Sequence, residues 1–338
     1  LVSRLDRPRE GLPYLRKVVT DLDEKIAAGE VVMNNWKHVS LAQALRNIGQ
    51  TAAAIAVLER APQPPAVGQI WHWQQTYLSA RRPAEIIALQ HSLKGQLQHP
   101  EVDSQKIDAY LDLSRTEVEV GWTGSPDPAL RLYAQFSDLP DLPPGYSIFL
   151  LRFTDRHQEM LDALAKLGAA FDPMEPYPDD ATRYRITALR GLGNEALAQS
   201  YLQSLLQTDL APDGPRADVN WAAQAYYHAA LGDQDAAQKA IATCRAAMDA
   251  QRNLSGYLQA QRIIAMAYAE LGFPAEAAAA IDAVLSSPGP FLTGHFMVES
   301  VLLPIRHTPE FEAVIRKHAD QLKDPAILEQ YFGPPDGR

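Results

Sequence analysis

Alanine-rich amphipathic segments dominate this chain, and stretches that alternate polar and β-branched residues are scarce. Apolar residues three and four positions apart predict helices with one buried face. The clearest part is the last third, which predicts two pairs of helices, at residues 219–231 and 233–248 and then at residues 258–271 and 275–285. A glycine separates the two helices of each pair, since glycine readily takes the left-handed conformation that ends a helix. Pro274 can then start a helix because the first helical position needs no amide hydrogen.

The same turn signal recurs along the chain. We place turn centres at residues 49, 81, 124, 155, 193, 232 and 272, with successive gaps of 32, 43, 31, 38, 39 and 40 residues. The period is that of helix–turn–helix repeats with insertions.

Residues around these turns repeat as well. Five positions after the centre there is usually an alanine, at Ala54, Ala129, Ala198, Ala237 and Ala277. Nine positions after it there is a large side chain, at Leu58, Tyr133, Leu164, Leu202, Ile241 and Ile281, with Gln90 as the exception. A small residue lets two helices approach closely, and the large ones fill the space between neighbouring pairs.

These features resemble the tetratricopeptide repeat family over residues 35–290. The last repeat carries the most specific match, from Ala265 through Tyr268, Gly272, Ala277 and Ile281 to Pro288. Residues 66–180 match more weakly, because proline clusters at 62–65, 140–144 and 173–178 interrupt helices and lengthen loops. The resemblance implies an all-α fold, a right-handed superhelical solenoid of about seven helix–turn–helix repeats. A helical bundle with coincidental spacing is the alternative.

A second resemblance follows the repeats. Residues 303–315, read as LPIRHTPEFEAVI, look like the DPLRxDPRFxxLL segment that closes many bacterial signalling proteins. In those proteins, tetratricopeptide repeats follow a winged-helix, kinase or nucleotide-cyclase domain. We therefore expect a capping helix that starts at Pro309 and covers the end of the solenoid with Phe311 and Ile315. The expected organisation is a helical lead-in at 1–33, the solenoid at 34–290, the capping segment at 291–332 and a tail at 333–338.

Composition limits the function further. The chain has 338 residues and a formal net charge of −10, which argues against a nucleic-acid binder because phosphate contacts need a cationic surface. Cys244 is the only cysteine, so an internal disulfide is excluded, and we expect it to pack as a small apolar residue. The sequence starts at Leu1 and suggests a processed or partial chain, so cytoplasm and periplasm both stay open.

Candidate catalytic chemistry is weak. His295, His307 and His318 lack a ligand-like spacing, and Ser125 lies in a turn rather than in a nucleophile elbow. The Gly191–Asn194 turn lacks the lysine of a phosphate-binding loop. We therefore expect neither an active site nor a bound metal or cofactor.

The inner face of the expected solenoid is the candidate binding surface. If the first helix of each pair lines it, residues about three, six, ten and thirteen before each turn centre share one stripe. The candidate groove residues are Trp36, Gln43, Arg46, Trp71, Gln75, Arg152, Arg183, Arg190, Tyr226 and Arg262. Asp180 is the one acidic residue on this stripe, although the whole chain is acidic.

An arginine guanidinium can donate two parallel hydrogen bonds to a carboxylate. Aromatic side chains offer a large contact area and have few rotatable bonds to immobilise. The sequence therefore predicts a protein-interaction or sensor module that binds an acidic or C-terminal-carboxylate segment of a partner. Pairing of these arginines with acids on neighbouring helices is the structural alternative. A small-ligand or regulatory domain attached to a kinase or cyclase outside this chain is the functional alternative, and self-association through exposed helix faces is a third.

Overall fold

We describe a computed structural model that covers residues 8–28, 36–97, 102–136, 144–167, 178–207, 216–251 and 254–333. Within these ranges every regular element is helical. The α-helices of the first half are α1 (Pro8–Ala27), α2 (Trp36–Asn47), α3 (Thr51–Arg60), α4 (Ile70–Ser79), α5 (Pro83–Leu93), α6 (Ser104–Thr123), α7 (Asp127–Phe136), α8 (Pro144–Leu151) and α9 (His157–Leu167). Those of the second half are α10 (Pro178–Gly191), α11 (Glu195–Leu206), α12 (Ala217–Ala230), α13 (Gln234–Gln251), α14 (Leu254–Glu270), α15 (Pro274–Leu285), α16 (Thr293–Val298), α17 (Pro309–Lys317) and α18 (Ile327–Phe332). Three short 3₁₀ helices complete them, η1 (Val67–Gln69), η2 (Ser300–Ile305) and η3 (Ala319–Gln321).

The turns lie where the sequence predicts them. Six of the seven predicted centres have a positive φ, namely Gly49, Arg81, Gly124, Gly193, Gly232 and Gly272. At five of them the next residue donates its amide hydrogen to the carbonyl five positions back, as Gln50 does to Leu45 at 2.9 Å. This is the Schellman arrangement, which satisfies the last carbonyls of a helix. The predicted centre at Asp155 is different, since α8 ends at Leu151 and a longer turn precedes α9.

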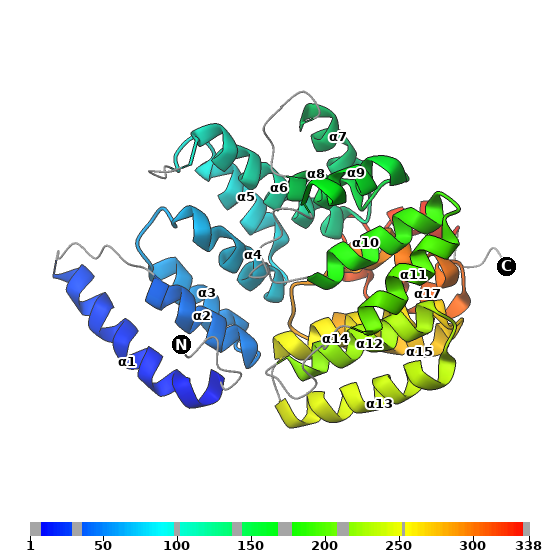
Figure 1. Ribbon diagram of the computed structural model, residues 1–338. Coiled ribbons are helices and arrows are strands. Elements are labelled where there is room, and N and C mark those ends of the chain that lie inside the picture. The colour runs from blue at the N-terminus through cyan, green and yellow to red at the C-terminus, as the bar shows by residue number, and fades with distance from the viewer. Residues whose placement is uncertain are drawn as a thin grey trace.

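The small residues after the turns are buried as expected. Ala54, Ala129, Ala198, Ala237 and Ala277 are all 0% exposed, so each of these second helices packs closely against its neighbours. Each helix from α1 to α15 contacts the next one along the chain, and α4 also contacts α2. Figure 1 shows these pairs following a curved path, from α1 at one end, over α5 to α9, to α12–α15.

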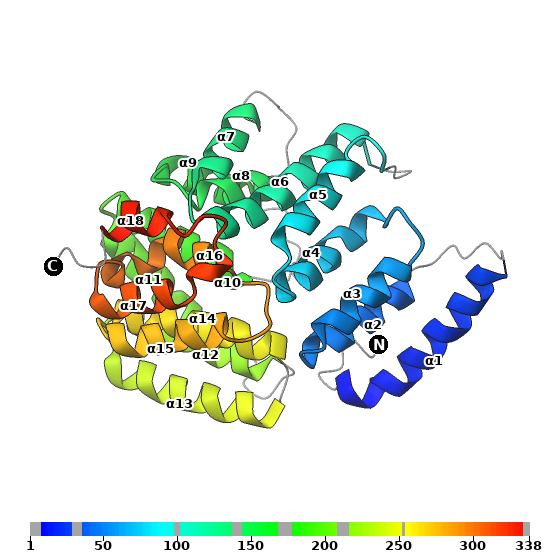
Figure 2. The same ribbon diagram turned by 180° about the vertical axis from the view of Figure 1, so that it is seen from behind.

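The C-terminal part returns to the first half of the chain. Residues 286–299, which we call the strap, lead from α15 to η2, and α16 within the strap packs against α6. Arg81 donates hydrogen bonds to the carbonyls of Leu285, Ser287 and Phe291 at 2.7, 2.9 and 2.6 Å. A Cβ at Gly49, in the first turn, would touch Pro288 at 3.7 Å. The path of helices is thus closed by the strap, as the reverse view also shows (Figure 2).

The predicted closing helix is present as α17. It begins at Pro309, and Thr308 caps it by accepting a hydrogen bond from the amide of Phe311. Phe311 and Ile315 are fully buried in the core cluster that also holds α12–α15, and α17 packs on α15. Of the predicted tail, only Gly333 lies within the described residues. No described helix is long and apolar enough to cross a bilayer.

Candidate functional site: the central cavity

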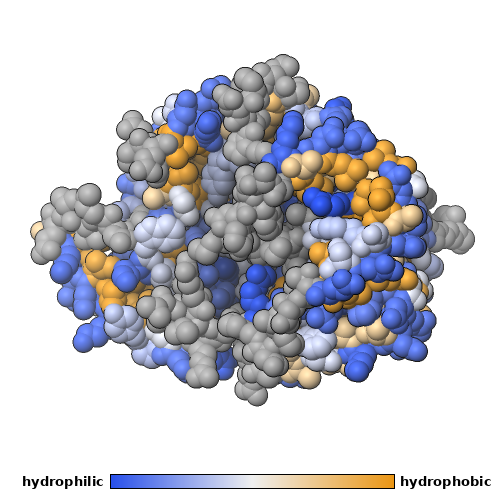
Figure 3. Space-filling model, viewed as in Figure 1, coloured by the Kyte–Doolittle hydropathy of each residue, from blue (hydrophilic) through white to orange (hydrophobic). Residues whose placement is uncertain are grey.

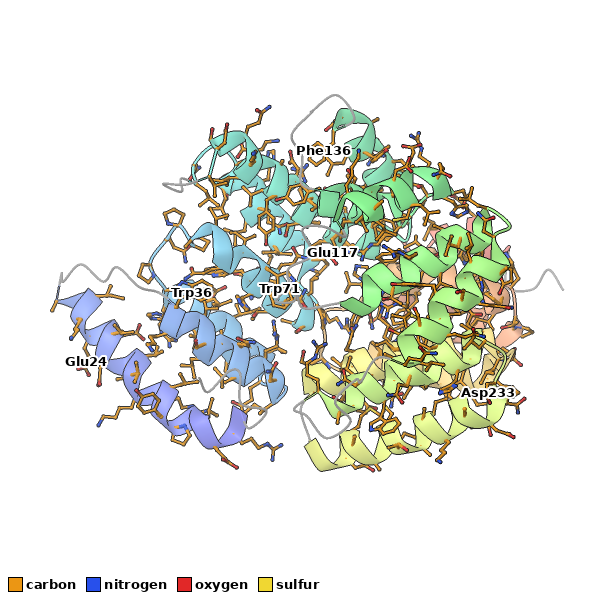
Figure 4. The ribbon with its side chains drawn as sticks, viewed as in Figure 1. Glu24, Trp36, Trp71, Glu117, Phe136 and Asp233 are labelled. Atoms are coloured by element: carbon orange, nitrogen blue, oxygen red, sulfur yellow. The ribbon has the colours of Figure 1, made fainter. Side chains whose placement is uncertain are left out.

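A cavity of about 520 Å³ lies at the centre of the ring of helices. Its walls come from α2, α4, α6, α8, α10 and α14, which are first helices of their pairs, and from the strap. No described residue of the second helices lines it. Figure 3 shows hydrophilic side chains deep in the centre of this face, and Figure 4 places Trp71 and Glu117 there with Trp36 farther out.

Five of the predicted groove residues meet in this cavity: Arg46, Trp71, Gln75, Arg152 and Arg262. They come from four different helix pairs, at the offsets that place a residue on the inner face. The walls between them are largely aromatic or aliphatic, with Tyr110, Phe149, Phe153, Tyr184 and Phe291 among the lining residues.

The other five predicted residues do not line the cavity. Trp36 is 43% exposed at the start of α2, where its ring meets His72 edge-on, and Gln43 is half-buried. Tyr226 is 1% exposed in the core of α12 because α12 packs between α13 and α14. The side chain of Asp180, the predicted acidic member of the stripe, lies outside the described residues.

Arg183 and Arg190 lie between helices rather than on the cavity wall. Arg190 binds both carboxylate oxygens of Glu270, at 3.1 and 2.9 Å, and donates to the Ala230 carbonyl at 2.6 Å. Arg183 is 1% exposed, and its charge helps to lower the pKa of Glu299. For Arg190 the structural alternative is therefore correct, because this arginine pairs with an acidic residue of another helix, Glu270, and does not face the cavity.

Arg152 is held by aromatic rings on the cavity wall. Its guanidinium carbon lies 4.0 Å from the centre of the Phe149 ring and 4.4 Å from that of Phe153. Nη1 donates to the hydroxyl of Tyr184 at 3.1 Å, while Nη2 reaches the Glu117 carboxylate only at 3.5 Å. Stacking fixes the plane of the guanidinium without occupying its in-plane donors. Arg152 therefore retains donor capacity, and its buried Nε has no hydrogen-bond partner within the described residues.

Arg262 has a much closer partner. Its Nη2 donates to Glu299 Oε2 at 2.7 Å, and both side chains are 11% exposed. Burial acts to raise the pKa of Glu299, but the neighbouring Arg262 and Arg183 charges outweigh it and hold that pKa below its usual range. This pair fixes α14 to the end of the strap.

His295 joins the strap to α6 as a neutral ring. Nδ1 accepts the amide hydrogen of Leu292 at 3.0 Å, so the proton lies on Nε2, which faces the Glu117 carbonyl at 3.2 Å. Burial lowers the pKa of His295 to about 4, and the arginine charges of the cavity add to this effect. His295 thus serves as a structural hydrogen-bonding group at neutral pH.

The acidic side of the cavity was missing from the sequence prediction. Glu117, Ser114 and Tyr110 come from α6, and counting ten residues back from the turn centre at Gly124 would have found Ser114. Glu299 and Phe291 come from the strap, which lies outside the repeat register and gives no such signal. The expected excess of positive charge remains, since Arg46, Arg152 and Arg262 face Glu117 and Glu299.

Gln90, the polar exception among the large core residues, supports Glu117 from behind. Its amide donates to Gln74 Oε1 at 3.0 Å and to Ser114 Oγ at 2.9 Å. Gln74 in turn donates to Glu117 Oε2 at 2.8 Å. A buried polar chain of this kind orients its last member, because each donor must meet its acceptor.

Other predicted features take structural positions. Cys244 is fully buried, its thiol bonds the Asp218 carbonyl at 3.0 Å, and burial raises its pKa to about 12. His318 pairs with Asp282 at 2.7 Å next to α17. Among the described residues no cluster of histidine, cysteine and acidic side chains could hold a metal ion.

The cavity is thus a partly open, mostly apolar space, and among its described residues Arg152 is the arginine that retains donor capacity. No protein-family model matches the sequence, and no curated protein is significantly similar to it.

Proposed function

We propose that this chain is a tetratricopeptide-type binding module that takes an anionic segment of a partner protein into its central cavity. The segment is an acidic stretch or a carboxyl terminus. The single observation that carries the proposal is the cavity itself, which the first helices of successive pairs line with arginine and aromatic side chains. A net charge of −10 over the whole chain makes this local cationic site stand out.

Three features support the repeat type. The left-handed turns recur at the expected centres, the alanine five residues later is fully buried, and inner helices alone form the cavity wall together with the strap. On this proposal the chain is a right-handed solenoid of about seven repeats, with α17 as the cap of its C-terminal end. Residues 303–315 resemble the closing segment of bacterial signalling proteins, and on this proposal the chain is the sensing or scaffolding part of such a protein.

Arg152 is the residue on which the test should concentrate. We expect peptides with a free carboxyl terminus to bind more tightly than their amidated forms in calorimetry, and Arg152→Gln to remove that difference. Loss of a charged hydrogen bond in a desolvated site weakens binding by about tenfold or more. Arg131→Gln on α7, at an exposed position outside the cavity, is the matched control.

Two results would count against the proposal. Equal binding of free-acid and amidated peptides, together with equal binding of acidic peptides and their amide (Asn/Gln) counterparts, would remove the carboxylate from recognition. Equal effects of Arg152→Gln and Arg131→Gln would place the binding surface elsewhere on the molecule.

A small ligand is the second candidate. The cavity volume of about 520 Å³ lies within the range of small-molecule sites, and the strap closes the groove that an extended peptide would need. On this alternative the chain is a regulatory helical domain of an enzyme, such as a kinase or cyclase. A gain in melting temperature with a free aromatic carboxylate, but not with long acidic peptides, would favour it.

A further inference from the structure

Two buried amide side chains on the cavity wall have hydrogen-bonding atoms without a partner. Gln259 on α14 is 7% exposed and its Nε2 has no acceptor among the described residues. Asn47 at the end of α2 is 9% exposed and its Oδ1 has no donor there. Both residues line the cavity. A buried polar atom left unsatisfied costs about 1–3 kcal/mol, so such atoms normally meet a ligand or water.

Both residues lie at the strap end of the cavity. Two residues beyond Asn47, a Cβ at Gly49 would contact Pro288 at 3.7 Å. A Cβ at Gly289, the next residue of the strap, would fall 2.3 Å from the side chain of Leu258, which precedes Gln259. The strap therefore contacts the chain next to each of the two amides.

Arg262 connects Gln259 to the arginine of the site through Tyr184. Arg262 follows Gln259 by three residues, a rise of about 4.5 Å on a helix. Its guanidinium and that of Arg152 both bond the hydroxyl of Tyr184. A donor and an acceptor without a partner among the described residues thus share one cavity with the guanidinium of Arg152.

We propose that the ligand of this cavity contains an N-acyl amino acid unit, with its amide between Gln259 and Asn47 and its carboxylate at Arg152. Gln259 Nε2 donates to the amide carbonyl, and Asn47 Oδ1 accepts the amide hydrogen. Successive Cα atoms are about 3.8 Å apart, so a terminal carboxylate lies within one residue of its amide. The side chain then packs against the aromatic wall. This rests on the proposed function, since it presumes that the cavity binds an anion.

The N-acyl amino acid unit has two sources, the carboxyl terminus of a partner chain and a free N-acylated amino acid. N-acetyl-phenylalanine and acetyl-alanyl-alanyl-phenylalanine are therefore the first two probes. A gain in affinity with the longer probe assigns the site to a chain end, and equal affinity assigns it to the free compound.

Two analogues isolate the amide. One is 3-phenylpropanoate, which keeps ring and carboxylate but has no amide. The other is O-acetyl-phenyllactate, in which an ester oxygen replaces the amide N–H. We expect each to bind the unaltered protein at least fivefold more weakly than N-acetyl-phenylalanine, because a buried acceptor or donor then stays unpaired.

Variants connect each atom to its partner. Asn47→Leu should lower the affinity for N-acetyl-phenylalanine but leave that for the ester unchanged, since the ester has no hydrogen to donate to Oδ1. Gln259→Leu should weaken both, because both keep the carbonyl. Gln203→Leu, exposed on α11, is the matched control. Neither cavity variant should lower the melting temperature, since each removes an unsatisfied buried group.

The outcomes separate the two proposals. If 3-phenylpropanoate binds as well as N-acetyl-phenylalanine and both depend on Arg152, the amide inference is overturned and the anion site stands. If no carboxylate binds, both fail. If Asn47→Leu weakens the amide and the ester equally, the assignment of Oδ1 is overturned.

Discussion

Arg81 offers the most direct test of how the cavity is closed. It is the one described non-glycine residue with a positive φ, at 59°, and its guanidinium bonds four carbonyls from Leu285 to Phe291. Arg81→Ala removes these bonds and keeps the unfavourable backbone. Three of them are shorter than 3 Å, at 2.6, 2.7 and 2.9 Å.

The size of the effect follows from these bonds. Hydrogen bonds to a charged group contribute about 1.5–3 kcal/mol each in a buried setting. Arg81 is half-buried, so water can replace some of these hydrogen bonds in the variant. We therefore expect Arg81→Ala to weaken the free energy of strap closure by about 3 kcal/mol. At about 1.4 kcal/mol per tenfold, the strap should open about 150-fold more often.

Arg81→Gly separates the side chain from the backbone. Glycine adopts the left-handed conformation without the penalty of about 1 kcal/mol that other residues carry. The turn between α4 and α5 holds this conformation whether the strap is open or closed, so glycine should raise the free energy of unfolding by about 1 kcal/mol relative to alanine while the strap opens as often as in Arg81→Ala. The control is Arg82→Ala, because that neighbouring exposed arginine pairs with Glu85 and does not bond the strap.

Hydrogen–deuterium exchange of the strap is the suitable assay. Exchange of residues 286–299 should speed up about equally in Arg81→Gly and Arg81→Ala and stay unchanged in Arg82→Ala, while exchange in α13 stays constant. Unchanged strap exchange in Arg81→Ala would refute the view that this side chain closes the ring. Equal free energies of unfolding for the glycine and alanine variants would refute the backbone argument.

Three further outcomes follow from the packing and charges. Gly294→Ala should destabilise the protein by about 3 kcal/mol in urea unfolding, because its Cβ would lie 2.4 Å from the Gly121 carbonyl oxygen, which cannot move aside. Arg190→Met should cost about 2–3 kcal/mol by leaving the half-buried Glu270 carboxylate without its bidentate partner, without changing ligand affinity at fixed folded concentration. Stability should be full above pH 6.5 and fall towards pH 4 by about 2–3 kcal/mol for each of His295 and His72, since burial lowers both folded pKa values to about 4 and the unfolded state takes up the proton first.

Each of these outcomes has a matched comparison. Gly145→Ala has open space around its Cβ and should not destabilise. Arg156→Met removes an exposed pair with Glu159 and an exposed contact with the Tyr133 ring, and should cost at most about 1 kcal/mol. In His295→Gln the loss of stability between pH 6.5 and pH 4 should become smaller. An unchanged pH profile in that variant would show that other groups cause the acid sensitivity.

The sequence predicts the local structure well because the signals there are local. A glycine in a Schellman turn and an alanine five residues later act within one pair of helices, and both are found as expected at Gly232 and Ala237. The pattern fails where contacts join distant segments. Arg190 and Arg262 share one helical stripe in the sequence, yet Glu270 and Glu299 decide what each arginine does. No repeat period reports the position of such partners.

The strap also has a consequence for the order of folding. The Arg81–Phe291 hydrogen bond spans 210 residues, whereas contacts within one helix pair span a few tens. Closing so long a loop costs chain entropy before any contact offsets it, so neighbouring pairs should form first and the ring last. During synthesis the binding cavity cannot exist until residue 299 has left the ribosome, even when α2 to α14 are already folded. The closed cavity thereby distinguishes a chain that extends past residue 299 from every shorter folding intermediate.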